Sequence, residues 1–120
     1  MVEHSFPKRM RLLKPRDFER VMQVRVSASD GCLRMYGAAN DQEHPRLGLT
    51  VSRRVGGSTI RNIWKRALRE AFRLAQHDLP AFDIICIPHR DVTPDVGRLI
   101  ASLKKLTRRI DEELRRRSAR

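Results

Sequence analysis

The segment from Thr59 to Gln76 constrains the fold most, because its side chains divide into two opposite faces at helical spacing. Apolar residues recur roughly every three or four positions on one side, as in a helix that packs on a core: Ile60, Ile63, Trp64, Ala67, Leu68, Ala71, Phe72 and Ala75. The other side carries Arg61, Asn62, Lys65, Arg66, Arg69 and Arg73, with Glu70 at its edge. The pattern predicts an amphipathic helix with one buried face and one cationic face.

The cationic face is unusual because four of its charges, at positions 61, 65, 69 and 73, repeat at every fourth residue. Like charges at that spacing destabilise a helix by about 0.2–0.5 kcal/mol per pair. A chain that keeps them is suited to a polyanionic ligand. The whole chain has 26 Lys and Arg against 14 Asp and Glu, a net charge of +12. Nucleic acid is the commonest partner of such a surface, and a merely solvated face is the alternative.

Length and composition bound the class of protein. The 120 residues suffice for one domain and the 40% of apolar residues for a core, with a basic arm at 1–10 and an Arg-rich tail at 115–120 expected to be flexible. No apolar run approaches the roughly 18 residues of a membrane span, and residues 1–11 lack the apolar region of a signal peptide. We therefore expect a cytoplasmic protein. Cys32 and Cys86 lie in separate apolar stretches and are expected to be buried free thiols.

Two further helices are predicted. Pro15 suits the first turn of a short helix in which apolar residues share one face. Thr93 is expected to cap a final helix that has Pro94 at its first position. Ser58 or Thr59 is expected to cap the amphipathic helix between them.

Strands are expected at Cys32–Tyr36, at 47–51 and at Asp83–Ile87. The last is fully apolar, which indicates a central strand, and Pro88 is expected to end it because proline cannot continue a ladder. The order is helix, strands, helix, strand, helix. It predicts an α+β fold in which helices pack on a small mixed sheet.

No arrangement of residues predicts catalysis by side chains of this chain. The histidines at 4, 44, 77 and 89 lack the spacing of a metal site on one element. Asp111, Glu112 and Glu113 are consecutive and fan around a helix, whereas a two-metal nuclease gathers its carboxylates in one cleft. We therefore expect no catalytic residue and no metal bound by the protein itself.

Residues beside the cationic face add to the expected nucleic-acid contacts. Arg53 and Arg54 precede the amphipathic helix next to Gly56 and Gly57, and backbone N–H groups at a helix start attract phosphate. Asn62 could contact a base edge or a 2′-hydroxyl, or it could cap the adjacent turn.

Aromatic residues are divided between core and surface. Trp64 lies at the centre of the apolar arc and is expected in the core. Tyr36 shares its strand face with Arg34, an arrangement found where proteins hold single-stranded RNA. Phe18 fits either such a surface or the core equally well.

Two consecutive segments resemble the bacterial ribonuclease P protein family. Residues 47–56 read LGLTVSRRVG, and the family pattern is G-L-S-V-S-[KR]-[KR]-x-G. Residues 60–73 read IRNIWKRALREAFR, and the family helix has R-N-R-x-K-R-x-x-R-[EQ]-x-F. Residues 11–21 and 83–87 extend the resemblance over nearly the whole chain.

The resemblance implies an α–β sandwich with a mainly antiparallel sheet and a left-handed βαβ crossover, similar to a ribosomal-protein domain. It also implies a protein that joins a catalytic RNA, which holds catalytic Mg²⁺, and that grips the 5′ leader of precursor tRNA while the leader is removed. No obligate protein partner is implied. By position, the RNA contacts would be Arg53, Arg54, Arg61, Asn62, Lys65, Arg66 and Arg69. The leader cleft would include Phe18, Tyr36 and Arg11.

The chain departs from the family pattern at informative positions. Ile63 replaces the third residue of the R-N-R triplet, so that arginine's contacts cannot be transferred. Met22 stands where relatives often have a second aromatic residue. Three other functions stay open from the residues alone: a ribosomal-RNA-binding protein, a self-sufficient nuclease, and a DNA-binding protein with the amphipathic helix in the major groove.

Overall fold

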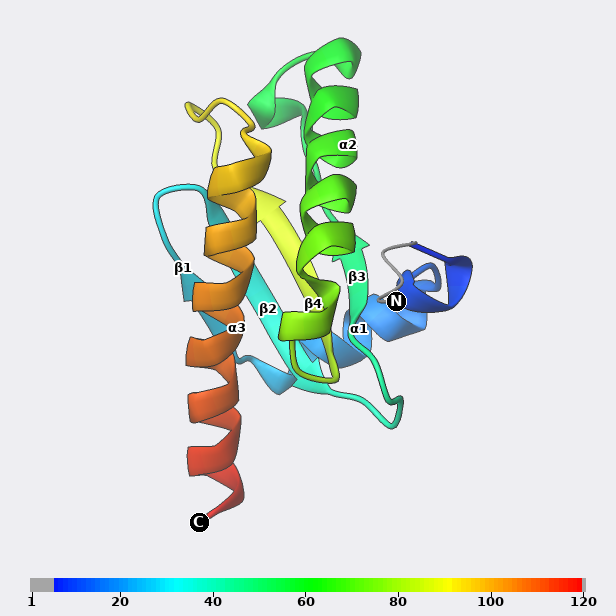
Figure 1. Ribbon diagram of the computed structural model, residues 1–120, viewed down its shortest axis with the longest axis vertical. Helices are drawn as coiled ribbons and strands as arrows, with labels where there is room; N and C mark the ends of the chain where they lie inside the picture. The colour runs from blue at the N-terminus through cyan, green and yellow to red at the C-terminus, as the bar shows by residue number, and fades with distance from the viewer. Residues whose placement is uncertain (1–5, 120) are drawn as a thin grey trace.

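The computed structural model describes residues 6–119, in which three α-helices pack on a four-stranded sheet (Figure 1). The elements follow one another in this order: η1 (Lys8–Met10), α1 (Pro15–Val24), β1 (Ser27–Ser29), β2 (Leu33–Ala39), β3 (Arg46–Leu49), η2 (Arg53–Val55), α2 (Ser58–Ala75), η3 (Gln76–Asp78), β4 (Phe82–Pro88) and α3 (Val96–Ser118). The η elements are single turns of 3₁₀-helix.

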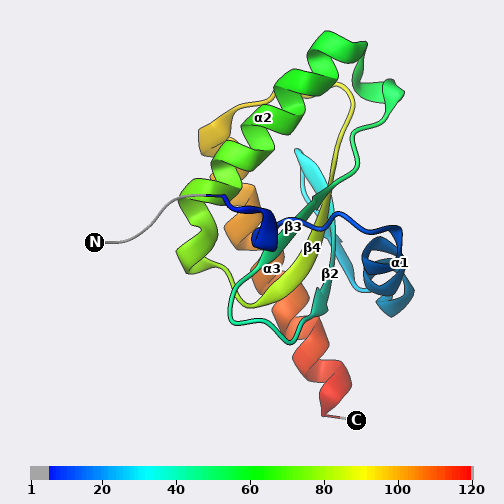
Figure 2. The same ribbon diagram turned by 90° about the vertical axis from the view of Figure 1, so that its right-hand side faces the viewer.

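The sheet has the strand order β1-β2-β4-β3, so β4 is an inner strand, as its apolar sequence predicts. It pairs antiparallel with β2 and parallel with β3, and β1 pairs antiparallel with β2. The parallel strands β3 and β4 are joined through α2, and Figures 1 and 2 together show that this crossover is left-handed. Crossovers of this kind are usually right-handed, so the left hand follows from the family resemblance and not from the general rule. The strand pairing and the crossover together confirm the expected α+β sandwich.

The helices cover the two faces of the sheet unequally (Figure 2). Helices α2 and α3 pack side by side on one face and enclose the main core, in which Trp64 and Phe72 are fully buried. Helix α1 packs on the opposite face over a smaller cluster that includes Val21 and Ile85. In this arrangement one side of α2, called its outward side, faces away from the sheet and from α3.

The two cysteines are free and buried, as expected. Cys86 on β4 is fully buried, and burial in apolar surroundings raises the pKa of its thiol to about 12.

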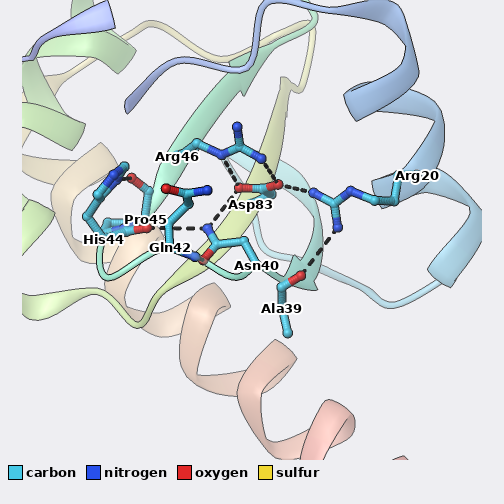
Figure 3. A network of polar contacts seen from close by, with 8 residues as sticks. All are labelled: Arg20, Ala39, Asn40, Gln42, His44, Pro45, Arg46 and Asp83. Carbon is cyan, nitrogen blue, oxygen red and sulfur yellow. Dashed lines mark hydrogen bonds and ion pairs between the residues drawn. The ribbon is translucent and has the colours of Figure 1, made fainter. Parts of the chain in front are cut away.

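A buried carboxylate joins three segments at one end of the sheet (Figure 3). Asp83 on β4 accepts hydrogen bonds from Nε and Nη2 of Arg46 on β3, at 2.7 and 2.6 Å. It also accepts from Asn40 Nδ2 at 2.9 Å and forms an ion pair with Arg20 on α1. The network fixes α1 against the β3–β4 edge, and the side chain of Asp83 is fully buried within it.

Both expected helix caps are wrong. Helix α2 has Gly57 as its N-cap, with no side-chain cap, and Ser58 is already its first helical residue. Helix α3 begins at Val96, later than predicted, because the Oδ1 of Asp95 accepts the N–H of Arg98 at 2.9 Å and caps the helix there. Thr93 therefore lies in the loop before α3.

Strand and helix ends also differ from the predicted ranges. Strand β3 ends at Leu49, so Val51 is outside it, whereas Pro88 is the last residue of β4. Proline is tolerated there because β3 pairs with β4 only as far as Cys86. Helix α3 is formed through Arg115–Arg117, which we expected to fray.

The basic arm was predicted at 1–10, and the part of it at 1–5 lies outside the described residues. Within the described part, Met10 is buried in the main core. No helix in residues 6–119 is both long enough and apolar enough to cross a bilayer.

Candidate nucleic-acid interface

The outward side of α2 presents the cations predicted from the helical pattern. Asn62, Arg66 and Arg69 are exposed, and Arg61 and Lys65 are partly exposed. Together these five residues are called the α2 cationic face below. Within residues 6–119, none of the cations of this face forms an ion pair. Their charges are therefore available to an external anion.

Arg73 differs from the other cations of the helix. Its Nε and Nη2 donate to the two carboxylate oxygens of Glu70 at 3.0 and 2.5 Å. Hydrogen bonding between them raises the pKa of Arg73 and lowers that of Glu70. Glu70 thus neutralises Arg73, the last of the four cations that repeat at every fourth residue of the helix.

A hollow of 710 Å³, called the polar hollow, lies over the α2 cationic face. Thr59, Asn62, Ile63, Lys65, Arg66 and Arg69 line it. Hydroxyl, amide, ammonium and guanidinium groups therefore converge on one concave surface. Phosphate oxygens and base edges accept hydrogen bonds from groups of these kinds.

A second hollow, of 210 Å³, adjoins the polar hollow where α2 meets the N-terminal segment, α1 and β3, and it is called the aromatic hollow. Its lining consists of Phe6, Arg11, Leu12, Leu13, Phe18, Leu47, Leu49, Lys65 and Arg69. The structure therefore brings Phe18 and Arg11, two predicted cleft residues, next to two predicted RNA contacts. Lys65 and Arg69 line both hollows and connect them.

The N-terminal segment forms one wall of the aromatic hollow. Arg11 pairs with Leu47 in an isolated parallel bridge, and the Leu12 N–H donates to the Leu47 carbonyl at 2.9 Å. The Arg11 guanidinium lies 4.6 Å from the ring centroid of Phe6. Cation–π contact holds this aromatic ring and this charge together at the edge of the sheet.

The opposite wall depends on Gly48, the first glycine of the motif at 47–56. A Cβ at this position would lie 2.9 Å from two ring carbons of Phe18 and 3.1 Å from Leu12 Cδ1. Only a residue without a side chain lets Phe18 approach the backbone of β3 so closely. The motif glycine therefore positions an aromatic ring on the neighbouring helix.

Tyr36, the third predicted cleft residue, does not line the aromatic hollow. It is partly buried on β2 and packs against the smaller cluster beneath α1, which Phe18 and Ile87 also contact. Phe18 is thus shared between this cluster and the aromatic hollow.

The start of α2 carries the remaining predicted contacts. Arg53 and Arg54 are exposed in η2, and Ser52 Oγ accepts the N–H of Arg54 at 3.3 Å. Because Gly57 offers no side-chain cap, the first N–H groups of α2 have no side-chain partner in the described part of the chain. These groups and the helix dipole favour an anion.

The sequence reasoning missed the apolar part of the aromatic hollow. Phe6 and Leu13 lie in segments without helical or strand periodicity, so no pattern assigned them a face. A lone aromatic residue within a basic stretch was the available signal for Phe6. Among residues 6–119, no group of three or more His, Cys, Asp or Glu is placed to hold a metal ion.

Comparisons with known proteins agree on one family. A model of the Ribonuclease P family matches residues 6–111. The Ribonuclease P protein component of Escherichia coli strain E24377A is 40% identical over 111 residues, covering 91% of this chain and 93% of that protein. The RNase P protein of Staphylococcus aureus has a TM-score of 0.71 at 31% identity, covering 82% of this chain and 93% of that one. The RNase P protein from Thermotoga maritima has a TM-score of 0.69 at 31% identity, and the match covers 79% of this chain and 96% of that one.

Proposed function

The chain belongs to the ribonuclease P protein family, and from this premise we propose that it binds the catalytic RNA of ribonuclease P and the 5′ leader of precursor tRNA. In this function it promotes endonucleolytic removal of the leader, which gives the mature 5′ end of the tRNA. The resemblance drawn from residues 47–56 and 60–73 is thereby confirmed at the level of the family.

One observation supports the proposal most: Lys65 and Arg69 line both the polar and the aromatic hollow. A cation shared between two concave surfaces can contact one RNA strand on each side. The catalytic RNA is assigned to the polar hollow, with Arg53 and Arg54 at its end. The leader is assigned to the aromatic hollow, where Phe18 offers a face for a base and Arg11 a charge for a phosphate.

Electrostatics gives the protein its role in the reaction. The RNA catalyst and the RNA substrate are both polyanions and repel each other. A chain with a net charge of +12 between them lowers that repulsion and orients the leader. Catalytic Mg²⁺ is assigned to the RNA, whose phosphates would hold it. The side chains of this protein bind and position, and we assign no catalytic residue among them.

The partners and location follow from this assignment. The chain acts with the catalytic RNA and precursor tRNA in the cytoplasm, without an obligate protein partner. Tyr36 lies outside the aromatic hollow, and we assign it to the leader through the part of its side chain that stays exposed beside α1.

Reconstitution tests the proposal directly. Precursor tRNA is incubated with the catalytic RNA at low Mg²⁺, with and without the protein, and 5′ cleavage is measured. We expect the protein to accelerate cleavage, because electrostatic help matters most where Mg²⁺ is scarce. No acceleration at any Mg²⁺ concentration would contradict the proposal and favour a ribosomal-RNA-binding protein.

Two controls separate the other functions. Cleavage by the protein alone would indicate a nuclease with its own active site. Preference for duplex DNA over structured RNA in a competition assay would indicate a DNA-binding protein. We expect neither result.

A further inference from the structure

An exposed apolar surface lies where α2 begins. Ile60 and Ile63 are 46% and 51% exposed, although both belong to the apolar side of the helical pattern. With Val55, Val92 and other residues they line a hollow of 480 Å³, called the isoleucine hollow. Three segments form it: η2, the start of α2 and the β4–α3 connection. Figure 1 shows the start of α2 and the β4–α3 connection at the same end of the molecule. Apolar surface left open in this way commonly marks a binding site.

The isoleucine hollow is shaped before any ligand binds. Gly56 has a φ of 145°, which an L side chain rarely adopts, and a Cβ there would lie 2.9 Å from Ile60 Cδ1. The glycine thus lets the turn close on Ile60. This contact orients one wall of the hollow, so little ordering is needed when a ligand enters.

Charged groups surround the apolar lining of the isoleucine hollow. Arg54 and Arg90 line the hollow, both exposed, and Asp91 lies beside Arg90 at 3.8 Å. Ile63 lines the polar hollow as well, so the isoleucine hollow is continuous with the α2 cationic face. A ligand that fits both the isoleucine hollow and the α2 cationic face must combine a flat group that packs on the isoleucines with negative charge.

We propose that the isoleucine hollow receives one unstacked nucleobase of the RNA that binds α2. The base covers Ile60 and Ile63, and Arg54 and Arg90 contact the phosphates that flank it. This inference rests on the proposed function and adds a base contact to it. Proteins recognise RNA largely through bases that leave the stack, and the volume lies in the range of about 300–1,000 Å³ typical of small-ligand sites.

The chemistry favours a base over a protein partner. A stable protein interface buries about 800 Å² on each side, which would extend from this hollow onto the α2 cationic face. RNA satisfies those cations with the same strand that carries the base. In place of the charge that the family pattern has at position 63, Ile63 supplies apolar contact to a base.

Methyl NMR tests the contact directly. The protein, with ¹³C-labelled isoleucine methyl groups, is titrated with a five-residue oligoadenylate and with an abasic oligomer of equal charge. Ring currents should shift the δ1 methyl signals of Ile60 and Ile63 upfield with the oligoadenylate only. The buried Ile110 is the internal control. Equal shifts with both oligomers, or none, would overturn the proposal.

Affinity measurements give a second test. Ile63→Ala should weaken binding of the catalytic RNA about threefold to tenfold, because it removes apolar contact with one base. The slope of log affinity against log salt should stay unchanged, since no cation is lost. Leu74→Ala, at a 40% exposed position on the same helix, is the matched control and should bind as the wild type does. Arg54→Ala should lower the slope by about one.

The outcomes separate this inference from the proposed function. If the wild type binds the catalytic RNA but Ile63→Ala binds equally well, the base contact is wrong and the proposed function stands. If the wild type does not bind that RNA, both fail. Shifts of the Ile63 methyl that depend on protein concentration alone would assign the hollow to a second copy of the chain and overturn the proposal.

Discussion

Arg46 and Asp83 form a bidentate ion pair across the parallel strands β3 and β4, with nitrogen–oxygen distances of 2.7 and 2.6 Å. The two residues are register partners in the sheet. The hydrogen bonds to Asp83 raise the pKa of Arg46 above its ordinary value. Since Asp83 also pairs with Arg20 on α1, one carboxylate holds both the edge strand and the helix that carries Phe18.

Asp83→Asn should lower the free energy of unfolding by about 3 kcal/mol. The substitution removes the buried charge that two arginines share, and breaking a buried pair typically costs about 3–5 kcal/mol. Urea denaturation followed by circular dichroism measures the loss. Asp78→Asn is the control, because Asp78 is 64% exposed and pairs with Lys104 at the surface. Equal stability of the two variants would show that the network contributes little.

Neutralising Lys65 and Arg69 together should weaken binding of the catalytic RNA and lower its salt dependence. Each lost phosphate contact reduces the slope of log affinity against log salt by about one, which corresponds to roughly tenfold to sixtyfold weaker binding at 0.1 M salt for the pair. Charge reversal at both positions should weaken assembly further. Circular dichroism should be unchanged, since neither side chain is in the core.

Arg108→Ala provides the matched control for the charge change. Arg108 is exposed on α3, away from the polar and aromatic hollows. If its loss weakens RNA binding as much as the loss of Lys65 or Arg69, the attraction comes from net charge and the α2 cationic face has no special role.

The parts of the fold that could be predicted are those specified by residues near one another in sequence. The periodicity of 59–76 located α2 within one residue at each end, and the apolar run at 83–87 identified the inner strand β4. The cationic face followed from the same periodicity. The motif at 47–56 identified the family because its residues occupy fixed positions along one strand and turn.

The parts that could not be predicted depend on residues far apart in sequence. Arg20 and Asp83 are separated by 63 positions, and no local pattern pairs them. The aromatic hollow joins Phe6 to Arg69 only because the N-terminal segment runs along β3. The caps were mispredicted for a local reason, since several polar or small residues precede each helix and the sequence alone does not decide which of them is the N-cap.

Gly48→Ala should destabilise the protein by about 1–3 kcal/mol and weaken binding of the leader. The added methyl group would meet the ring of Phe18 at 2.9 Å, and overpacking of this kind forces the ring or the strand to move. Thermal denaturation measures stability, and binding of a single-stranded leader oligonucleotide measures the effect on the aromatic hollow. Gly31→Ala is the control, because a Cβ at that position would have nothing within 4 Å of it. Unchanged leader binding in a folded Gly48→Ala protein would show that the position of Phe18 does not matter for binding of the leader.

Asp30 should give the protein an acid-dependent part of its stability. Burial disfavours the charged carboxylate of Asp30, but hydrogen bonds from Ser102 and the backbone of Leu33 and Cys32, with Lys105 nearby, outweigh it and lower the pKa from 3.8 to about 2. A carboxyl whose pKa is lower in the folded than in the unfolded protein binds fewer protons when folded. Its contribution is therefore complete above the unfolded pKa and disappears as the pH falls to the folded pKa.

Between about pH 5 and pH 2 the wild type should consequently lose about 2 kcal/mol more unfolding free energy than Asp30→Asn, since one pKa unit corresponds to about 1.4 kcal/mol. The carboxylate is only 7% exposed, so solvent screens this interaction weakly. Urea denaturation at a series of pH values measures the difference, and Glu112→Gln, at an exposed position on α3, should follow the wild type. Parallel pH profiles for the wild type and Asp30→Asn would mean that Ser102 and the two backbone N–H groups bind the neutral side chain as strongly as the carboxylate.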